Sequence, residues 1–181
     1  PEHDSEETKT QKQIARNLDL AQCTAAEYQE APCDIILDAV FGIGLGREIG
    51  GEYRKALEML ASLREKYGTG VIAVDTPSGI HGTTGEVMGI ALEADITVTF
   101  GFAKTGLLLY PGKYYAGNLV VADIGFPQAS LLKAGWDAKL STPDDLSWLP
   151  KRQPDGNKGT FGKVLVIAGS RGMSRAAYFS A

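Results

Sequence analysis

Two carboxylates stand at the ends of short apolar segments, and a loop of small residues follows each of them. Asp38 ends the segment that begins at residue 34 and precedes a glycine-rich loop. Asp75 ends the apolar run 71–74 and precedes Thr-Pro-Ser-Gly. In an open parallel sheet, ligands bind beyond the carboxyl ends of the strands, so the two segments predict a candidate site. A carboxyl group held at such an edge can move protons to and from a substrate.

Asp38 lies in an apolar setting, where an unpaired carboxylate is costly to bury. It therefore needs a cation, an arginine or several backbone N–H donors. Two interpretations stay open: Asp38 caps the loop that follows it, or it binds a cation. The hydroxyl of Ser78 is expected at the same edge, and oxygen ligands of this kind suit hard cations. A serine nucleophile is disfavoured because no Gly-x-Ser-x-Gly elbow surrounds Ser78.

The glycines at positions 42, 44 and 46 allow tight turns and close approach of the backbone to a phosphate-bearing ligand. Their spacing differs from the Gly-x-Gly-x-x-Gly fingerprint, and the loop lacks the Lys-Ser/Thr of a P-loop. A structural turn and a ligand-binding loop therefore both stay open. Lys104 follows another strand that points to the same edge, so it is either solvated or holds a substrate or a carboxylate.

Strands that alternate with helical or loop segments favour an α/β fold with a mostly parallel sheet. The patterns predict strands at 34–41, 71–75, 94–100 and 118–124, and helices at 5–18 and 52–67. Ser5 is expected to cap the first of these helices. The proline- and glycine-containing stretch 135–157 is typical of a linker, and 162–168 is typical of a buried strand that begins a second domain.

Composition narrows the class of protein. The 181 residues carry a net charge of −4, with 44% hydrophobic and 22% charged residues, as in globular domains. The sequence has no basic stripe of the kind that would indicate nucleic-acid binding. It also has no apolar run that approaches the ~20 residues of a membrane helix. The two cysteines make no disulfide framework, so we expect a cytoplasmic protein. Because the chain opens on Pro1 and closes at Ala181 within a helix-like sequence, we expect an internal fragment.

Four ordered motifs resemble the second half of the NAD(P)H-hydrate epimerase domain. They are Asp38-Ala-Val-Phe-Gly-Ile-Gly-Leu-Gly-Arg-Glu, Val74-Asp-Thr-Pro-Ser-Gly, Thr97-Val-Thr-Phe-Gly-Phe-Ala-Lys-Thr-Gly and Gly117-Asn-Leu-Val-Val-Ala-Asp-Ile-Gly-Phe-Pro. The stretch from Asn157 to Met173 looks like the opening of an ADP-dependent NAD(P)H-hydrate dehydratase. Both parts in one chain are similar to the bifunctional NAD(P)H-hydrate repair enzymes.

The resemblance implies a Rossmann-like three-layer sandwich, followed by the first strand and helix of a ribokinase-like α/β domain. The epimerase part would span residues 1–134, a linker 135–157, and the truncated dehydratase domain 158–181. The family's Asn-Asn-Gly-rich loop would lie upstream of Pro1, and the nucleotide loop and acid of the dehydratase beyond Ala181. Arg175 also stands where dehydratases usually carry a glycine.

The resemblance further implies nicotinamide cofactor repair. The epimerase would interconvert the R and S hydrates of NADH and NADPH, and the dehydratase would remove water from the S form with ADP as cofactor. Asp38 and Ser78 would bind a potassium ion. Asp75 is the expected acid/base group, with Lys104 as a second catalytic residue. The expected substrate-binding residues are Gly42, Ile43, Gly44, Leu45, Gly46, Arg47, Glu48 and Asp75.

Two other classes compete with this interpretation. One is a non-catalytic epimerase-like scaffold, and the other is a generic nucleotide-binding Rossmann enzyme. The presence of Asp38, Asp75 and Ser78 together argues against the scaffold, and the absent fingerprint argues against the Rossmann enzyme. We further expect a homo-oligomer at full length, and weak stability of the isolated chain, because loss of a first strand leaves an open sheet edge.

Overall fold

The computed structural model forms two compact units, Pro1–Gly135 and Trp136–Ala181, and the candidate site lies in the first. The boundary between the two units, after Gly135, lies next to the expected boundary at residue 134. That the second unit begins a dehydratase domain stays a prediction. The residues that the structure describes are 5–25, 27–28, 31–135, 138–148, 151, 154–157, 159–172 and 175–180.

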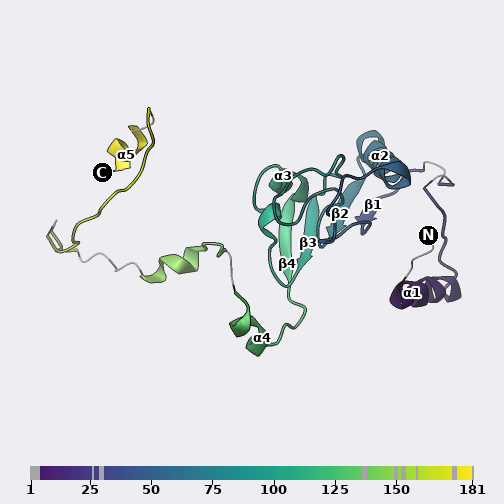
Figure 1. The fold of residues 1–181 in the computed structure, drawn as a ribbon, viewed down its shortest axis with the longest axis horizontal. Helices are drawn as coiled ribbons and strands as arrows, with labels where there is room; N and C mark the ends of the chain where they lie inside the picture. Colours follow the sequence, from purple (N-terminus) through teal and green to yellow (C-terminus); the bar gives the residue numbers. More distant parts are fainter. Residues whose placement is uncertain are drawn as a thin grey trace. The chain divides into compact units, whose positions relative to one another are not determined.

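A four-stranded parallel sheet forms the centre of the first unit (Figure 1). Its strands follow one another in the order β1-β2-β3-β4 and pair in parallel throughout. The expected α/β class with a parallel sheet is thereby confirmed. Strands β1, β3 and β4 are shorter than the predicted segments that contain them, and β2 is displaced by one residue from the predicted 71–75. The strands are β1 (Ile35–Asp38), β2 (Gly70–Val74), β3 (Ile96–Phe100) and β4 (Asn118–Ala122).

Two longer helices agree with the sequence pattern. Helix α1 (Glu6–Asn17) begins after Ser5, whose Oγ accepts the N–H of Thr8 at 3.2 Å, so the predicted cap is confirmed. Helix α2 (Gly51–Tyr67) ends at Gly68, which has a left-handed φ of 67°. The remaining helical elements are short: η1 (Thr105–Leu107), α3 (Gly112–Ala116), α4 (Gln128–Lys133), η2 (Pro143–Trp148) and α5 (Arg175–Ser180).

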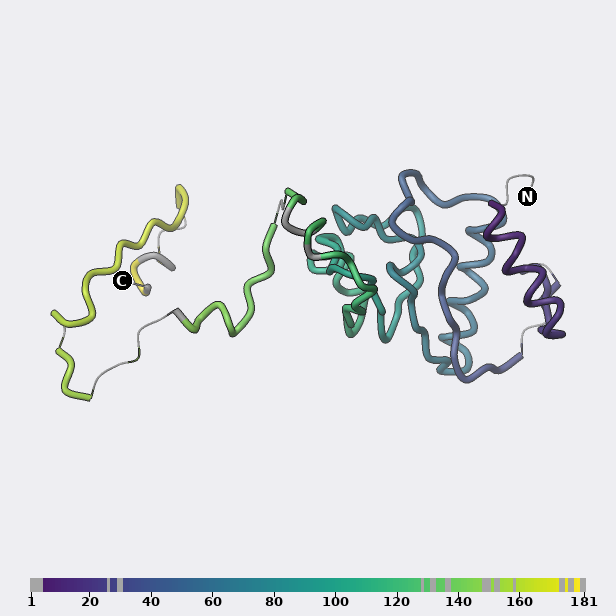
Figure 2. The backbone as a smooth tube through the Cα atoms, turned by 90° about the horizontal axis from the view of Figure 1, so that it is seen from below, coloured from purple at the N-terminus to yellow at the C-terminus, as the bar shows by residue number. Residues whose placement is uncertain are grey.

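Helix α2 packs on one face of the sheet, and its turns lie beside the strand segments in the backbone trace of Figure 2. Its buried Leu57 and Leu63 pack with the strand residues Ile36, Val71 and Ala73 in one apolar cluster. Strand residues alternate between the two faces, so their neighbours in sequence point away from this cluster. Within the described residues, that opposite face keeps exposed apolar side chains, among them Ile35 and Leu37 on β1.

The connection from β2 to β3 is a long ordered loop, residues 75–95, with no helix of its own. Ile80 and Leu92 are buried, so the loop has its own anchors in the core. Gly79 has a φ of 100°, and a Cβ there would lie only 1.9 Å from the carbonyl oxygen of Ile90. Glycine is therefore required where the loop turns back on itself, directly after the candidate ligand Ser78.

Residues 162–168, predicted as a buried strand, form no strand in the described part of the chain. The apolar side chains of Val164, Leu165 and Ile167 are exposed. The prediction is therefore wrong for this structure. A strand needs a neighbour that pairs its backbone N–H and C=O groups, and among the described residues none pairs with this segment. Separately, none of the described helices has both the length and the apolar composition needed to cross a bilayer.

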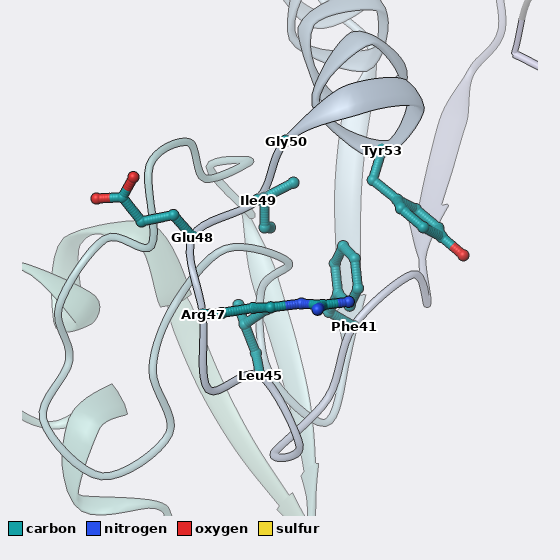
Figure 3. Close-up of a pocket in the computed structure, with 7 residues that line it drawn as sticks. All are labelled: Phe41, Leu45, Arg47, Glu48, Ile49, Gly50 and Tyr53. Atoms are coloured by element: carbon teal, nitrogen blue, oxygen red, sulfur yellow. The ribbon is translucent and has the colours of Figure 1, made fainter.

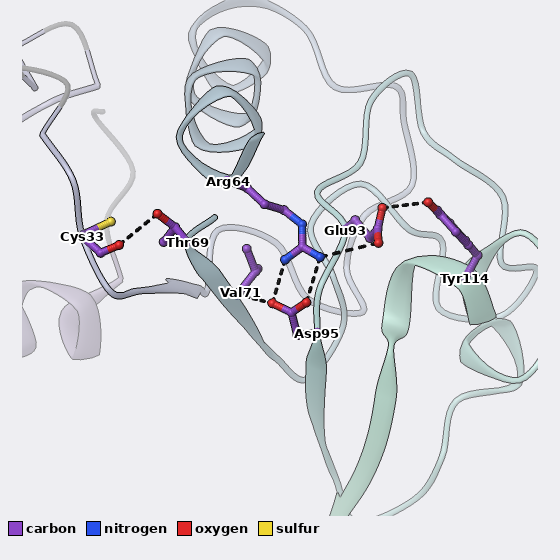
Figure 4. A network of polar contacts seen from close by, with 7 residues as sticks. All are labelled: Cys33, Arg64, Thr69, Val71, Glu93, Asp95 and Tyr114. Atoms are coloured by element: carbon purple, nitrogen blue, oxygen red, sulfur yellow. Dashed lines mark hydrogen bonds and ion pairs between the residues drawn. The ribbon is translucent and has the colours of Figure 1, made fainter. Parts of the chain in front are cut away.

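A polar network joins α2 to the start of β3 (Figure 4). The guanidinium of Arg64 donates to both oxygens of Asp95, at 2.6 and 2.8 Å, and the N–H of Val71 donates to Asp95 Oδ2 at 2.7 Å. Arg64 also lies 3.5 Å from Glu93, which accepts the hydroxyl of Tyr114 at 2.9 Å. The hydrogen bonds from Arg64 and Val71 lower the pKa of Asp95 to about 2.

Replacing Asp95 with asparagine is expected to lower the free energy of unfolding at pH 7 by about 1 kcal/mol, since the pair is partly exposed. The folded-state pKa is depressed, so this contribution is present above pH ~4 and disappears as the pH falls toward about 2. Urea denaturation at pH 7 and at lower pH measures the difference between the two proteins. Glu52→Gln, in the exposed ion pair with Lys55, is the control and should change little. A deficit of Asp95→Asn that did not shrink in acid would contradict this account.

Candidate functional site

Asp38 and Ser78 meet at the carboxyl ends of β1 and β2, although forty residues separate them. The Ser78 hydroxyl donates to Asp38 Oδ1 at 2.5 Å, and the Ser78 N–H donates to Asp38 Oδ2 at 2.7 Å. Asp38 is 1% exposed, and the N–H of Val40 lies 3.4 Å from its Oδ1. The Ser78 oxygen in turn accepts the N–H of Phe41 at 2.9 Å. The carboxylate of Asp38 therefore fixes the loop after β1 and the loop after β2. Among the described residues it forms no ion pair.

Asp75 and Lys104 form a second pair at the same edge. The Lys104 ammonium lies 2.5 Å from Asp75 Oδ1, and the two side chains are only 18% and 17% exposed. The same ammonium donates to Thr99 Oγ1 at 2.8 Å and to the carbonyl oxygen of Phe100 at 3.0 Å. Asp75 Oδ1 also accepts the N–H of Phe100 at 3.1 Å. The strand end of β3 thus supplies partners for both members of the pair.

The backbone of Asp75 leaves the strand geometry, with a φ of 69°. This left-handed conformation is uncommon for residues other than glycine, and aspartate and asparagine tolerate it best. Burial raises the pKa of Asp75, but the hydrogen bonds from Lys104, Phe100 and Thr99 and the charge of Lys104 outweigh it. The net result is a lowered pKa, so Asp75 is ionised at neutral pH.

The glycine-rich loop, residues 42–48, runs past the Asp75–Lys104 pair. A Cβ on Gly42 would lie 3.7 Å from Asp75 Oδ2, and Ile43 reaches within the same distance of a Cβ on Gly82. At Gly44 and Gly46 a Cβ would meet no atom within 4 Å. Contacts with the described residues therefore give no steric reason for a glycine at position 44 or 46. This is what a loop needs if a ligand is to approach its backbone.

Beside this loop lies a cavity of about 380 Å³ (Figure 3). The rings of Phe41 and Tyr53 form its aromatic side, with centroids 5.0 Å apart and planes tilted by 57°. The side chain of Arg47 crosses toward the Phe41 ring, while Glu48 points away from it (Figure 3). The cavity thus combines apolar walls with one cation, Arg47, and one carboxylate, Glu48. Its lining residues are Phe41, Leu45, Arg47, Glu48, Ile49, Gly50 and Tyr53.

The structure brings the sequence-predicted residues together in two groups at one edge. Asp38 and Ser78 form one group, and Asp75 and Lys104, with Gly42 beside them, form the other. Leu45, Arg47 and Glu48 line the adjacent cavity, and the side chain of Ile43 is exposed. Sequence reasoning missed Thr99, Phe41 and Tyr53. Only Thr99 had a readable signal, because it alternates with Thr97 along a strand that leads to Lys104.

The arrangement offers oxygen ligands and one ionised carboxylate. Among the described residues, no three His, Cys, Asp or Glu side chains gather into a metal-binding group. A cation at Asp38 and Ser78 would therefore need backbone or further hydroxyl oxygens as ligands, which are the ligands of hard ions. Asp75 Oδ2 accepts no hydrogen bond from the described residues, so it is free to meet a substrate.

Comparison with known proteins gives relatives that are named as bifunctional NAD(P)H-hydrate repair enzymes or as NAD(P)H-hydrate epimerases. The bifunctional NAD(P)H-hydrate repair enzyme Nnr of Thermofilum pendens is 47% identical over 138 residues, which are 76% of this chain and 25% of that protein. The NAD(P)H-hydrate epimerase of Limosilactobacillus fermentum is 47% identical over 90 residues, 50% of this chain and 41% of that protein. The epimerase of Limosilactobacillus reuteri is 42% identical over 124 residues, 68% and 56% of the two chains.

This chain therefore spans about a quarter of the bifunctional relative and about half of the epimerases. A family model described as "YjeF-related protein N-terminus" matches residues 1–106, which include Asp38, Asp75, Ser78 and Lys104. The match covers more than half of the chain and all residues of the two groups at the sheet edge. The chain belongs to the YjeF-related protein N-terminus family.

Proposed function

We propose that this chain contains the reacting groups of an NAD(P)H-hydrate epimerase, which interconverts the R and S hydrates of NADH and NADPH. The observation that carries the proposal is the asymmetric carboxylate of Asp75. Its Oδ1 binds Lys104, and its Oδ2 faces the glycine-rich loop, where no described residue donates a hydrogen bond to it. The names of the relatives, repair enzyme and epimerase, support the same activity.

The chemistry requires a group that gives and takes one proton. In the hydrated ring, the carbinol carbon carries a hydroxyl beside the ring nitrogen. When this C–O bond breaks, the nitrogen lone pair forms a C=N⁺ bond and the hydroxyl leaves as water with an added proton. Water then returns to the opposite face and releases one proton, so the balance is zero. The proton that leaves with the hydroxyl comes from solvent, since Asp75 is ionised at neutral pH. Asp75 Oδ2 is suited to stabilise the cationic intermediate and to take the proton from the returning water, which it then passes back to solvent.

The neighbouring cavity supports a substrate with rings and phosphates. Phe41 and Tyr53 offer aromatic surfaces, and the guanidinium of Arg47 is suited to an anionic group. The open space at Gly44 and Gly46 leaves the loop backbone accessible. These features favour a dinucleotide over a small acid. We therefore assign the loop Gly42–Glu48 to substrate binding.

We also propose that Asp38 and Ser78 hold a potassium ion. The residues fit such an ion, because Asp38 is buried and, within the part of the chain that the structure describes, it has no cationic partner and its Oδ2 accepts only the N–H of Ser78. A carboxylate oxygen can accept a second interaction. When bound, the ion would offset the negative charge that Asp38 and Asp75 bring to one sheet edge.

The remaining assignments concern the longer protein. We propose that it also carries the ADP-dependent dehydratase, a lyase, because relatives of this chain are bifunctional repair enzymes. We further propose a cytoplasmic homo-oligomer that acts on a small-molecule substrate and binds neither nucleic acid nor membrane. The net charge of −4 of this chain supports the proposal that nucleic acids and membranes are not bound, since it offers no general attraction for polyanions.

Asp75→Asn in the full-length protein is expected to slow exchange between the R and S hydrates of NADH by about 100-fold or more, because the proton-transfer group is lost. Asparagine tolerates the left-handed φ of 69°, so the backbone should keep its conformation. Chromatographic separation of the two hydrates measures the exchange. Asp123→Asn is the matched control, an exposed aspartate directly after β4. Wild-type exchange in Asp75→Asn would refute the role of this carboxylate.

Potassium is expected to raise the melting temperature of the full-length protein relative to sodium at equal ionic strength. The gain in the free energy of unfolding follows ligand linkage, about 1.4 kcal/mol at ten times the dissociation constant. Asp38→Asn and Ser78→Ala should lose this potassium-specific gain. Thr69→Val removes another buried hydroxyl, which donates to the carbonyl oxygen of Cys33. This variant should be less stable than the wild type but should keep the potassium-specific gain. The site is excluded if Asp38→Asn keeps the full gain.

A further inference from the structure

We propose that Thr99 is a positioning residue, which engages Asp75 through Oδ1 alone and so leaves Oδ2 as the oxygen that meets the substrate. The inference rests on the proposed epimerase function and deepens it. Three donors converge on Oδ1: the ammonium of Lys104 at 2.5 Å, the N–H of Phe100 at 3.1 Å and the hydroxyl of Thr99 at 3.3 Å. Among the described residues, none donates to Oδ2.

The direction of the Thr99 hydroxyl proton follows from its partners. The Lys104 ammonium lies 2.8 Å from Thr99 Oγ1 and has no lone pair, so the hydroxyl must accept this hydrogen bond. Its single proton then remains for Asp75 Oδ1. The buried hydroxyl of Thr99 therefore connects the ammonium of Lys104 with the carboxylate of Asp75, and both Thr99 and Lys104 contact Oδ1 of that carboxylate.

Thr99 is better suited to this task than Lys104. It is fully buried on β3, and its β-branched side chain has few rotamers in a strand. Lys104 reaches the site on a flexible four-carbon stem. All three N–H groups of its ammonium can be accounted for by Asp75, Thr99 and the carbonyl of Phe100. In this arrangement no proton of Lys104 is left for the substrate, so Asp75 Oδ2 is the reacting atom.

The electrostatics of Asp75 agree with the geometry. Lys104 is the charged side chain that acts on Asp75 among the described residues. Burial raises the pKa of Asp75, and the hydrogen bonds from Lys104, Phe100 and Thr99 together with the Lys104 charge lower it further than burial raises it. Loss of the Thr99 hydroxyl should therefore leave the pKa of Asp75 less depressed.

The test compares two valine substitutions on one strand in the full-length protein. Thr97 is also fully buried on the same face of β3, but its hydroxyl donates to the carbonyl of Ala116 at 2.7 Å. Thr99→Val should lower kcat for hydrate exchange about tenfold with little change in KM, as one lost hydrogen bond would. It should also move the acid limb of the pH–rate profile to higher pH. Thr99→Ser should restore both, and Thr97→Val should change neither.

A second measurement needs no substrate. The folded pKa of Asp75 is depressed, so its contribution to stability is present above the unfolded pKa of ~3.9 and is lost as the pH falls through the folded value. The stability deficit of Thr99→Val should therefore shrink in acid, whereas that of Thr97→Val should not depend on pH. An unmoved acid limb and a pH-independent deficit for Thr99→Val overturn the proposal. If the wild type exchanges no hydrate but the deficit depends on pH as described, the epimerase function fails while the coupling of Thr99 to Asp75 stands.

Discussion

The hydrogen bonds between Asp38 and Ser78 are the connection around which the candidate site is arranged. They join the ends of β1 and β2 with a buried carboxylate that accepts the hydroxyl and the N–H of one serine. A carboxylate buried in this way is costly without such partners, so the two loops are held where the donors can reach it. Phe41 is tied to the same serine. The glycine-rich loop therefore starts from a fixed point beside Asp75.

Two carboxylates at one sheet edge acquire different properties from different neighbours. Asp38 has amide and hydroxyl donors but no ammonium among the described residues, and it is almost completely buried. Asp75 has an ammonium on one oxygen, a lowered pKa and a second oxygen that faces the loop. Environments that separate two acidic groups in this way commonly assign them separate roles. Here the separation agrees with the two roles we propose, cation binding for Asp38 and proton transfer for Asp75.

The sequence alone predicts the strands, the longer helices and the residues at the sheet edge, because apolar runs and strand-end acids are local signals. It could not decide whether Asp38 caps a loop or binds a cation, and the structure shows the capping bonds to Ser78 directly. Thr99 was missed because a threonine in a strand looks like ordinary β-structure until its partners are known. The strand predicted at 162–168 failed because pairing is a property of two segments, and the described residues include no partner for it.

The most direct test of the central claim is a crystal structure of the full-length protein with a nicotinamide hydrate bound. The account predicts that the carbinol oxygen of the hydrate lies within hydrogen-bond distance, about 3.2 Å or less, of Asp75 Oδ2. Lys104 and Thr99 should remain on Oδ1 in that complex. A hydrate whose carbinol oxygen contacts Lys104 instead, or which binds away from the edge formed by β1, β2 and β3, would contradict the account.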